Sequence, residues 1–463
     1  MDLITKKINH TIAKKAELVE LLELQGNPTW DAIITAVRSG GGSTLRAKMN
    51  SILDRSITEL TADDLSGLTQ IKNYLFYGCS YLQNVDIPES VVVIGEHSFE
   101  NCGVVSVKLK EGLKWIKQYS FKDCNALTTI CLPSSIETLS NYMFDGCSNL
   151  GNAYYNGSLE QWCSVVLGTI DSNPAKKFQN FYFLDNNGNI SYDNKKYSIL
   201  TSIVIPNSIT KILDATFQGW TFLQSVSFHQ SVTEIGRFTF ADCTSLVINT
   251  IPENITKIGD NAFKNTAITS ITISSTVTTI GYGIFQDCAN LTSVNIQNSS
   301  ISSDEFKGCV NLTNVTISNN TTSIGSSAFS GCTSLTEIAI PNSVISFMGN
   351  IFYNCTSLVK MTIPTTYSIS LNTTVKNVVI NDGSTSIQGQ YFRQCSSLES
   401  VTLPASITSI GSLAFISCHT DLTITYKGTQ LQWSSITKEQ NWNYIDQSHS
   451  ITTIHCTDGD ITL

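Results

Sequence analysis

Cysteine is the residue type with the greatest chemical potential in this chain, which has 14 cysteines among 463 residues. Thiolates bind zinc, and pairs of thiols form disulfides. Most of these cysteines, however, recur three residues after a phenylalanine, with a period of about 23 residues that matches no metal-ligand spacing. They are Cys79, Cys102, Cys124, Cys147, Cys243, Cys288, Cys309, Cys332, Cys355, Cys395 and Cys418.

The positions of these cysteines favour a structural role. Trp220 and Thr266 occupy the equivalent place in two other blocks, and neither residue could replace a disulfide partner or a thiolate ligand. We therefore predict a ladder of small, buried, apolar side chains, whose spacing permits an occasional oxidised pair. Cys131, Cys163 and Cys456 lie outside the ladder and also lack metal-ligand spacing.

The other polar residues form no catalytic pattern. The six histidines are scattered, and no Gly-x-Ser-x-Gly, Walker or Rossmann motif is present. Asp458-Gly459-Asp460 could offer oxygens to calcium, but a hairpin turn explains this tripeptide better. Asp304 and Glu305 are expected at a solvated helix start. The sequence thus predicts a protein that is not an enzyme, with no catalytic, cofactor-binding or metal-ligating residue.

These residues occupy fixed places in a block of sequence that recurs along the chain. The block reads Leu-x-x-Val/Ile-x-Ile/Leu-Pro, a turn, Ile-Gly, Ala-Phe and x-x-Cys, and one clear copy runs from Leu335 to Cys355. A period of this size is typical of a solenoid. We predict an α/β-type solenoid with a parallel β-sheet, in which Val-x-Ile, Phe and Cys point inward and the Gly turns the backbone.

The outward positions of the predicted strands form a broad surface of short polar side chains. Such a surface can hydrogen-bond a glycan or a protein loop, although exposed strands need polar residues for solubility in any case. The predicted binding residues are Ser225, Ser227, Ser270, Thr272, Ser293, Asn295, Asn314, Thr316, Lys360, Thr362, Ser400 and Thr402.

Residues 1–56 differ in kind from the repeats. Ile4, Ile8 and Ile12 recur at helical spacing, and the triple glycine 40–42 is a flexible joint. One interpretation is a helical cap that shields the first coil. The other is an anchoring module that docks into a larger assembly or forms a homo-oligomer.

Two stretches interrupt the repeat and resemble each other. Residues 155–162 align without gaps on residues 426–433, and both end in Gln-Trp. A polar segment and a predicted hairpin follow each, turning at Asn187-Gly188 and at Asp458-Gly459. The second copy can cap the open sheet edge. The first is expected as an insertion in one continuous array, with a cap between two arrays as the alternative.

This pattern defines the predicted domains and the places where aromatic residues gather. The domains are 1–56 (helical module), 57–153 (repeats), 154–196 (aromatic insert with hairpin), 197–425 (repeats) and 426–463 (cap with hairpin). The insert aromatics could stack on sugars, but covering a terminal coil explains them more economically. They are Tyr154, Tyr155, Trp162, Phe178, Phe181, Tyr182 and Phe183, and then Tyr426, Trp433, Trp442 and Tyr444.

Composition excludes two classes of partner. The net charge of −9 argues against nucleic acid, which requires clustered Lys and Arg. No apolar run approaches the roughly 20 residues of a membrane span, and the first residues lack the apolar stretch of a secretory signal.

Over residues 57–463 the block resembles the BspA-like, treponemal-type class of leucine-rich repeats, as seen in proteins of gut bacteria and their phages. The resemblance implies an extracellular or surface-exposed binding and adhesion protein without catalytic residues or cofactors. We expect the repeats to contact a host-surface protein or glycan while residues 1–56 bind other structural proteins of a phage virion or a bacterial surface. The alternatives are a structural spacer or decoration protein and, less favoured, a carbohydrate-active enzyme using Glu160 or Asp171.

Overall fold

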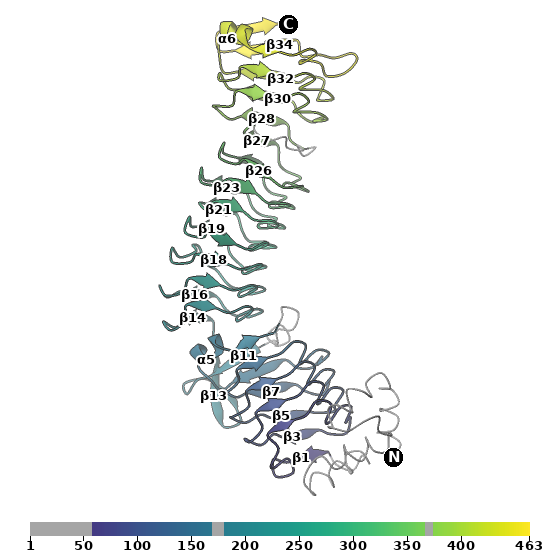
Figure 1. Cartoon of the computed structure of the whole chain (residues 1–463), viewed down its shortest axis with the longest axis vertical. Helices are drawn as coiled ribbons and strands as arrows, with labels where there is room; N and C mark the ends of the chain where they lie inside the picture. Colours follow the sequence, from purple (N-terminus) through teal and green to yellow (C-terminus); the bar gives the residue numbers. More distant parts are fainter. Residues whose placement is uncertain (1–57, 169–179, 366–373) are drawn as a thin grey trace, which may run out of the picture. The chain divides into compact units, whose positions relative to one another are not determined.

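The computed structural model describes residues 58–168, 180–365 and 374–463, so the predicted helical module at 1–56 and Phe178 lie outside the described residues. The chain divides into two compact units, Met1–Leu223 and Gln224–Leu463. In Figure 1 the strands of the second unit, from β16 to β34, follow one another in chain order.

Most coils contribute one strand to a parallel sheet, as the repeat predicts, and the coil around Thr250 contributes an isolated bridge to Thr272. In β19, Ile271 and Ile273 are buried, whereas Ser270 and Thr272 lie half-buried on the outer face. Neighbouring strands pair in register, which places equivalent residues of successive coils side by side. In the first unit these strands are β1 (Glu59–Leu60), β3 (Asn84–Asp86), β5 (Ser106–Lys108), β7 (Thr129–Leu132), β9 (Asn152–Tyr155), β11 (Asn180–Leu184) and β14 (Ser202–Val204). In the second they are β16 (Ser225–Ser227), β19 (Ser270–Ile273), β21 (Ser293–Ile296), β23 (Asn314–Ile317), β25 (Glu337–Ala339), β27 (Lys360–Ile363), β28 (Asn377–Ile380), β30 (Ser400–Leu403), β32 (Thr423–Tyr426) and β34 (Thr453–Cys456).

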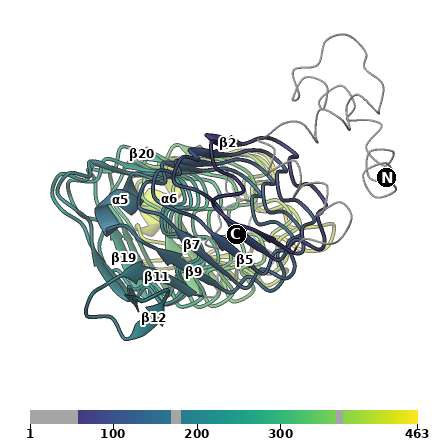
Figure 2. The same cartoon turned by 90° about the horizontal axis from the view of Figure 1, so that it is seen from below.

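A second strand, two residues long, lies on the opposite side of the coil. The end-on view in Figure 2 shows the two sets of strands apart from each other. In the first unit these strands are β2 (Gln70–Ile71), β4 (Val93–Ile94), β6 (Trp115–Ile116), β8 (Thr138–Leu139), β10 (Val166–Leu167) and β15 (Lys211–Ile212). In the second they are β17 (Glu234–Ile235), β18 (Lys257–Ile258), β20 (Thr279–Ile280), β22 (Ser300–Ile301), β24 (Ser323–Ile324), β26 (Ser346–Phe347), β29 (Ser386–Ile387), β31 (Ser409–Ile410) and β33 (Thr437–Lys438). The helices in the described part of the chain are α5 (Leu159–Cys163) and α6 (Gln430–Ser435). The described coils thus form a β-solenoid with parallel strand pairing on two sides of the coil, rather than an α/β-type solenoid.

The glycine of the Ile-Gly pair has a different role from the predicted turn. A Cβ added to Gly325 would lie 2.4 Å from the Ser303 nitrogen of the preceding coil. A Cβ on Gly411 would lie 2.3 Å from the Gly389 nitrogen. Close approach between coils therefore requires glycine here, because no larger residue fits without moving the backbone.

Phenylalanine and cysteine fill the interior between the two sheets. Phe285, Phe306 and Phe329 stack with ring centroids 5.8 and 5.4 Å apart. The Cys332 thiol donates a hydrogen bond to the Phe306 carbonyl at 3.3 Å, and other ladder cysteines repeat this bond to the preceding coil. The ladder thiols are unoxidised and mostly buried, and burial raises the pKa of Cys288 to about 11. The predicted ladder is therefore present, with each such thiol also serving as a donor.

Glu305 corrects one prediction from the sequence. It is fully buried in the position that Ala328 occupies one coil later, so it does not mark a solvated helix start. Its Oε2 accepts a bond from the Ser302 backbone N–H, whereas its Oε1 has no partner. Burial raises the pKa of this carboxyl to about 8.

The hairpin of the first aromatic insert also differs from its prediction. β12 (Ile190–Tyr192) and β13 (Lys195–Ile199) form the tight antiparallel pair, which turns at Asp193 and Asn194, both with positive φ. β13 lies between β12 and β11, so Asn187-Gly188 connects strands that do not pair with each other. Asp and Asn are the residues other than glycine that best tolerate the left-handed backbone of such a two-residue turn.

Strand pairing around the insert favours a cap over a continuous insertion. The sheet of two-residue strands that begins at β2 ends at β10, and the other sheet ends at the hairpin strand β12. β14 and β15 pair with no earlier strand among the described residues. The second hairpin, β34 with β35 (Gly459–Thr462), turns at Thr457 and Asp458, one residue before the predicted Asp458-Gly459, and Gly459 and Asp460 belong to β35.

Candidate ligand-binding groove

The predicted binding residues all lie on the outer face of the second unit. Ser225 and Ser227 are exposed on β16. Register between β19, β21 and β23 forms two rows, Ser270–Ser293–Asn314 and Thr272–Asn295–Thr316. On β27 and β30 the same rows hold Lys360 and Ser400 in the first, and Thr362 and Thr402 in the second.

Two of these side chains are already occupied within the protein. Lys360 forms an ion pair with Glu337 of the preceding strand at 3.0 Å. The Ser400 hydroxyl donates to the Asn377 side-chain oxygen at 2.6 Å. Both pairs lie in the first row, so a ligand there must compete with bonds inside the protein.

A shortened coil interrupts the regular spacing beside the second row. Lys360 pairs with Asn377, only 17 residues later, whereas Glu337 pairs with Lys360, 23 residues later. The short coil has no phenylalanine of the stack between Phe352 and Phe392. Its two long-sheet strands, β27 and β28, still pair in register.

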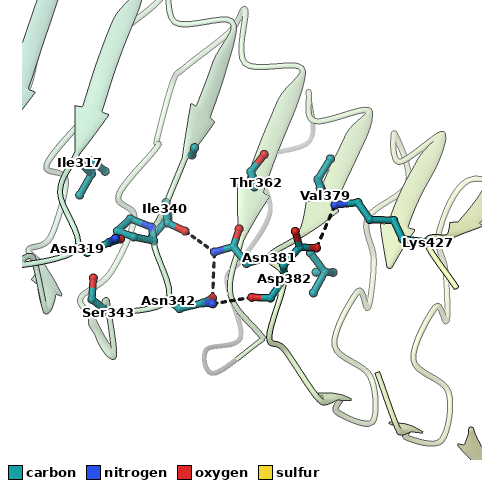
Figure 3. A pocket seen from close by; sticks show the side chains of 13 residues that line it. Ile317, Asn319, Ile340, Asn342, Ser343, Thr362, Val379, Asn381, Asp382 and Lys427 are labelled. Atoms are coloured by element: carbon teal, nitrogen blue, oxygen red, sulfur yellow. Dashed lines mark hydrogen bonds and ion pairs between the residues drawn. The ribbon is translucent and has the colours of Figure 1, made fainter. Parts of the chain in front are cut away.

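At this place the turns surround a groove of about 550 Å³ (Figure 3), a size within the range of small-molecule sites. The small outward side chains of Ala339, Thr362 and Val379 line it. The remaining lining residues are the last residues of β23 and β28 and the residues that follow the strands: Ile317, Ile380, Asn319, Ile340, Pro341, Asn342, Ser343, Asn381, Asp382 and Lys427. No described residue that lines the groove has an aromatic side chain, and Thr362 is the one predicted binding residue among those described.

Hydrogen bonds fix the turns across the groove. The Asn381 side-chain amide donates to the Ile340 carbonyl at 2.7 Å and to the Asn342 side-chain oxygen at 3.1 Å. Asn342 in turn donates to the Asp382 carbonyl at 2.8 Å. These contacts join residues about 40 positions apart, and they hold the rim in one arrangement.

The charges of the groove are exposed, and one hydroxyl is buried. Asp382 and Lys427 form an ion pair at 3.1 Å with 79 and 45% of their side chains exposed, so water weakens this pair and both groups can turn to a ligand. The Ser343 hydroxyl oxygen is buried without a hydrogen-bond partner. In the described ranges no group of three or more His, Cys, Asp and Glu is placed to hold a metal ion.

The sequence did not lead us to predict the turn residues of this groove as binding residues, although two signals mark them. The number of residues between Phe352 and Phe392 departs from the usual repeat length. Asn381 and Lys427 stand where other blocks have the proline after the strand. What these changes do depends on which turns meet in space.

Comparison with known families identifies the repeat. The family model described as "BspA type Leucine rich repeat region (6 copies)" matches residues 54–167, 188–302, 299–372 and 367–456. This chain therefore belongs to the BspA-type leucine-rich repeat family, and the resemblance seen in its sequence is confirmed. No curated protein matches the chain.

Solved structures with a similar chain include repeat proteins from gut bacteria. A leucine-rich repeat protein from Bacteroides ovatus is 23% identical, covering 73% of this chain and 83% of that one with a TM-score of 0.44. One from Eubacterium ventriosum is 20% identical, covering 90% of each chain with a TM-score of 0.39. A leucine rich cell surface protein from Faecalibacterium prausnitzii is 20% identical, covering 80% and 85% with a TM-score of 0.34.

Proposed function

We propose that this chain is a non-catalytic surface-recognition protein that binds its ligand with the groove between β23 and β32. The observation behind the proposal is a preorganised groove beside the rows of short polar side chains on this face. Its rim is fixed by the bonds of Asn381 and Asn342, so binding need not order the turns. The second row, which includes Thr272 and Thr316, extends the contact surface away from the groove.

Membership of this family supports a surface location, and no feature of the repeat requires catalysis. We propose an extracellular or surface-exposed protein, either on a bacterial cell or as an appendage of a phage virion. None of the described helices is long and apolar enough to cross a membrane. Residues 1–56 would then attach the repeats to other structural proteins or to further copies of the chain.

The proposed binding role is tested with the full chain on cells. Thr362→Trp places a large ring on the groove floor, and Thr272→Trp makes the same change in the same row outside the groove. Labelled wild-type protein should bind some members of a panel of intact bacterial and epithelial cells, as measured by flow cytometry. Thr362→Trp should lower the apparent affinity more than tenfold, with Thr272→Trp close to wild type. Binding to no cell, or equal binding by both variants, would refute the groove as the recognition site.

The anchoring role has its own test. Lys6, Lys7, Lys14 and Lys15 lie in the predicted helical module. Chemical cross-linking of the full chain in its native cell or particle should link these lysines to other structural proteins. Cross-links to such proteins that come only from repeat residues would contradict the proposal.

A structural spacer is the second candidate, and one observation favours it. The bonds of Lys360 to Glu337 and of Ser400 to Asn377 use outward groups for contacts between coils. If the whole face serves only to join coils, alanine at Ser270, Thr272, Asn314 and Thr316 together should leave cell attachment unchanged. A recognition face predicts weaker attachment of that variant in the same assay.

A further inference from the structure

The ladder thiols of the regular coils are bound to the coil before them. The Cys332 thiol donates to the Phe306 carbonyl at 3.3 Å, and the Cys309 thiol donates to the Phe285 carbonyl at 3.2 Å. Both cysteines are completely buried. A dissolved oxidant therefore cannot reach either thiol while these coils stay folded.

Cys395 differs from these residues because it is the first ladder cysteine after the short coil. The short coil has no phenylalanine of the stack whose carbonyl could bind the Cys395 thiol. The thiol instead lies 3.9 Å from the Arg393 carbonyl of its own turn, which is a weak contact. Cys395 is also half-buried, so solvent reaches it.

The Cys418 thiol lies directly beside Cys395. The Phe392 carbonyl accepts a bond from the Cys418 thiol at 3.1 Å and from the Cys395 backbone N–H at 3.2 Å. The two cysteines occupy the same place in coils that pair in register, and their thiols are hydrogen-bonded to each other. Adjacent coils lie about 4.8 Å apart, which is inside the range of Cα separations, about 4.4–6.8 Å, that a disulfide spans.

We propose that Cys395 and Cys418 are a redox-active pair, which a low-molecular-weight disulfide such as cystine converts to an intramolecular disulfide bond. The half-buried Cys395 attacks first as the thiolate, which breaks the S–S bond of the oxidant, forms a mixed disulfide and releases one small thiol. The buried Cys418 then attacks the Cys395 sulfur, and the second small thiol leaves. The protein thiols lose two electrons and two protons, and the two released thiols carry them.

The surroundings of Cys395 set the rate of this reaction. The hydrogen bond with Cys418 and burial raise the pKa of the Cys395 thiol. Its thiolate is therefore scarce at neutral pH, and the reaction should become faster as pH rises.

The disulfide would strengthen the array where its interior is interrupted. It would close residues 395–418 and join the first two coils after the break in the phenylalanine stack. The proposed surface location would expose the pair to oxidants. Neither cysteine lines the groove, so the proposed binding role stands or falls independently of this link.

The first unit repeats the arrangement at its first ladder cysteine. Cys79 is half-buried and follows a coil without a phenylalanine of the stack. The buried Cys102 donates to the Phe76 carbonyl at 2.9 Å, and the Cys79 backbone N–H donates to the same carbonyl at 3.1 Å. Cys79 and Cys102 should therefore link under the same conditions.

Disulfide mapping of the full chain tests the pairing. The reduced protein is incubated with cystine at neutral and at mildly alkaline pH, free thiols are blocked by alkylation, and peptide mass spectrometry identifies the linked cysteines. The link between Cys395 and Cys418 should form at least about tenfold faster than any link between Cys309 and Cys332, and faster at the higher pH. Equal rates for the two pairs, or Cys395 recovered only as a mixed disulfide, would overturn the proposal.

Hydrogen exchange of β30 and β31 measures what the link does to the coils that it joins. Oxidation of the wild type should slow exchange there by about tenfold. Cys395→Ser should abolish this slowing, whereas Cys309→Ser, the same change in a regular coil, should keep it. Slowing that persists in Cys395→Ser would show that the effect of oxidation comes from other thiols and would also overturn the proposal.

Discussion

The two aromatic modules have nearly the same local structure and opposite patterns of buried hydrogen bonding. In both, the strand leads into a short helix with a capping box, made by Ser158 with Gln161 in the first and Thr429 with Gln432 in the second. These bonds join residues three apart, so the motif alone produces them.

In each module one of two buried aromatic donors has a hydrogen-bond acceptor, and it is the tryptophan in the first module and the tyrosine in the second. In the first module the Trp162 indole N–H donates to the Thr216 carbonyl at 2.9 Å, while the Tyr155 hydroxyl is buried without a partner. In the second the Tyr426 hydroxyl donates to the Ala405 carbonyl at 3.2 Å, while the Trp433 N–H is buried without a partner. The acceptors come from other coils, which shows that equal motifs do not secure equal partners.

Glu305, a buried acid in a regular coil, extends this contrast between partnered and unpartnered buried groups and gives the largest expected effect, because one of its oxygens has no partner. In the folded protein its pKa is raised to about 8 from 4.5, so the folded state keeps a proton that the unfolded chain releases. The free energy of unfolding should therefore fall as pH rises from about 4.5 to 8 and level off above. Glu305→Ala, which copies Ala328, should remove this slope and stabilise the second unit at pH 8 by on the order of 3 kcal/mol.

Urea unfolding between pH 4 and 9 measures the effect of Glu305. Asp304→Asn is the control, since it changes the neighbouring acid, which is half-buried and paired with Lys307. That variant should keep the wild-type slope. A flat profile for the wild type would show that the buried carboxyl has found a partner.

The tryptophan pair gives the next largest effect. Trp162→Phe removes a donor and leaves the Thr216 carbonyl buried without it, whereas Trp433→Phe removes a donor that has no partner. Both lose ring volume, so the difference isolates the hydrogen bond. Trp162→Phe should cost about 1–2 kcal/mol more, measured as local opening free energy by hydrogen exchange of each module. Equal losses would mean that Trp433 also has an acceptor in solution.

The tyrosine pair should give the reverse order. Tyr426→Phe removes the bond to Ala405 and should lower the local opening free energy by about 1 kcal/mol. Tyr155→Phe deletes an unpartnered hydroxyl and should be neutral or slightly stabilising. The same exchange experiment measures both, and a loss at Tyr155 comparable to that at Tyr426 would remove the reciprocity.

The helix caps should show almost no difference. Ser158→Ala and Thr429→Ala each break a capping box of the same geometry, so each should cost about 1 kcal/mol. Exchange rates of the amides of α5 and α6 report the two costs. If they diverge by more than the cost of one cap, the context of the modules affects even their local bonds.

The same division between local and distant effects explains what could be predicted of the groove. Thr362 was predicted because alternation along a strand fixes which side chains face outward. Asn342, Asn381 and Lys427 were not, because they follow strands in turns whose neighbours belong to other coils. Glu305 was misplaced for a similar reason: its type suggested solvent, but its repeat position is an interior one.

The sequence by itself determined the repeat, the parallel pairing and the interior of Phe, Cys and Ile. Each coil needs only its nearest neighbours to bury this pattern, so the periodicity contains the necessary information. The tertiary structure alone decided where the coils fail to match. The short coil brings Asn381 to the Ile340 carbonyl, because such matches depend on which residues meet across coils and not on any single block.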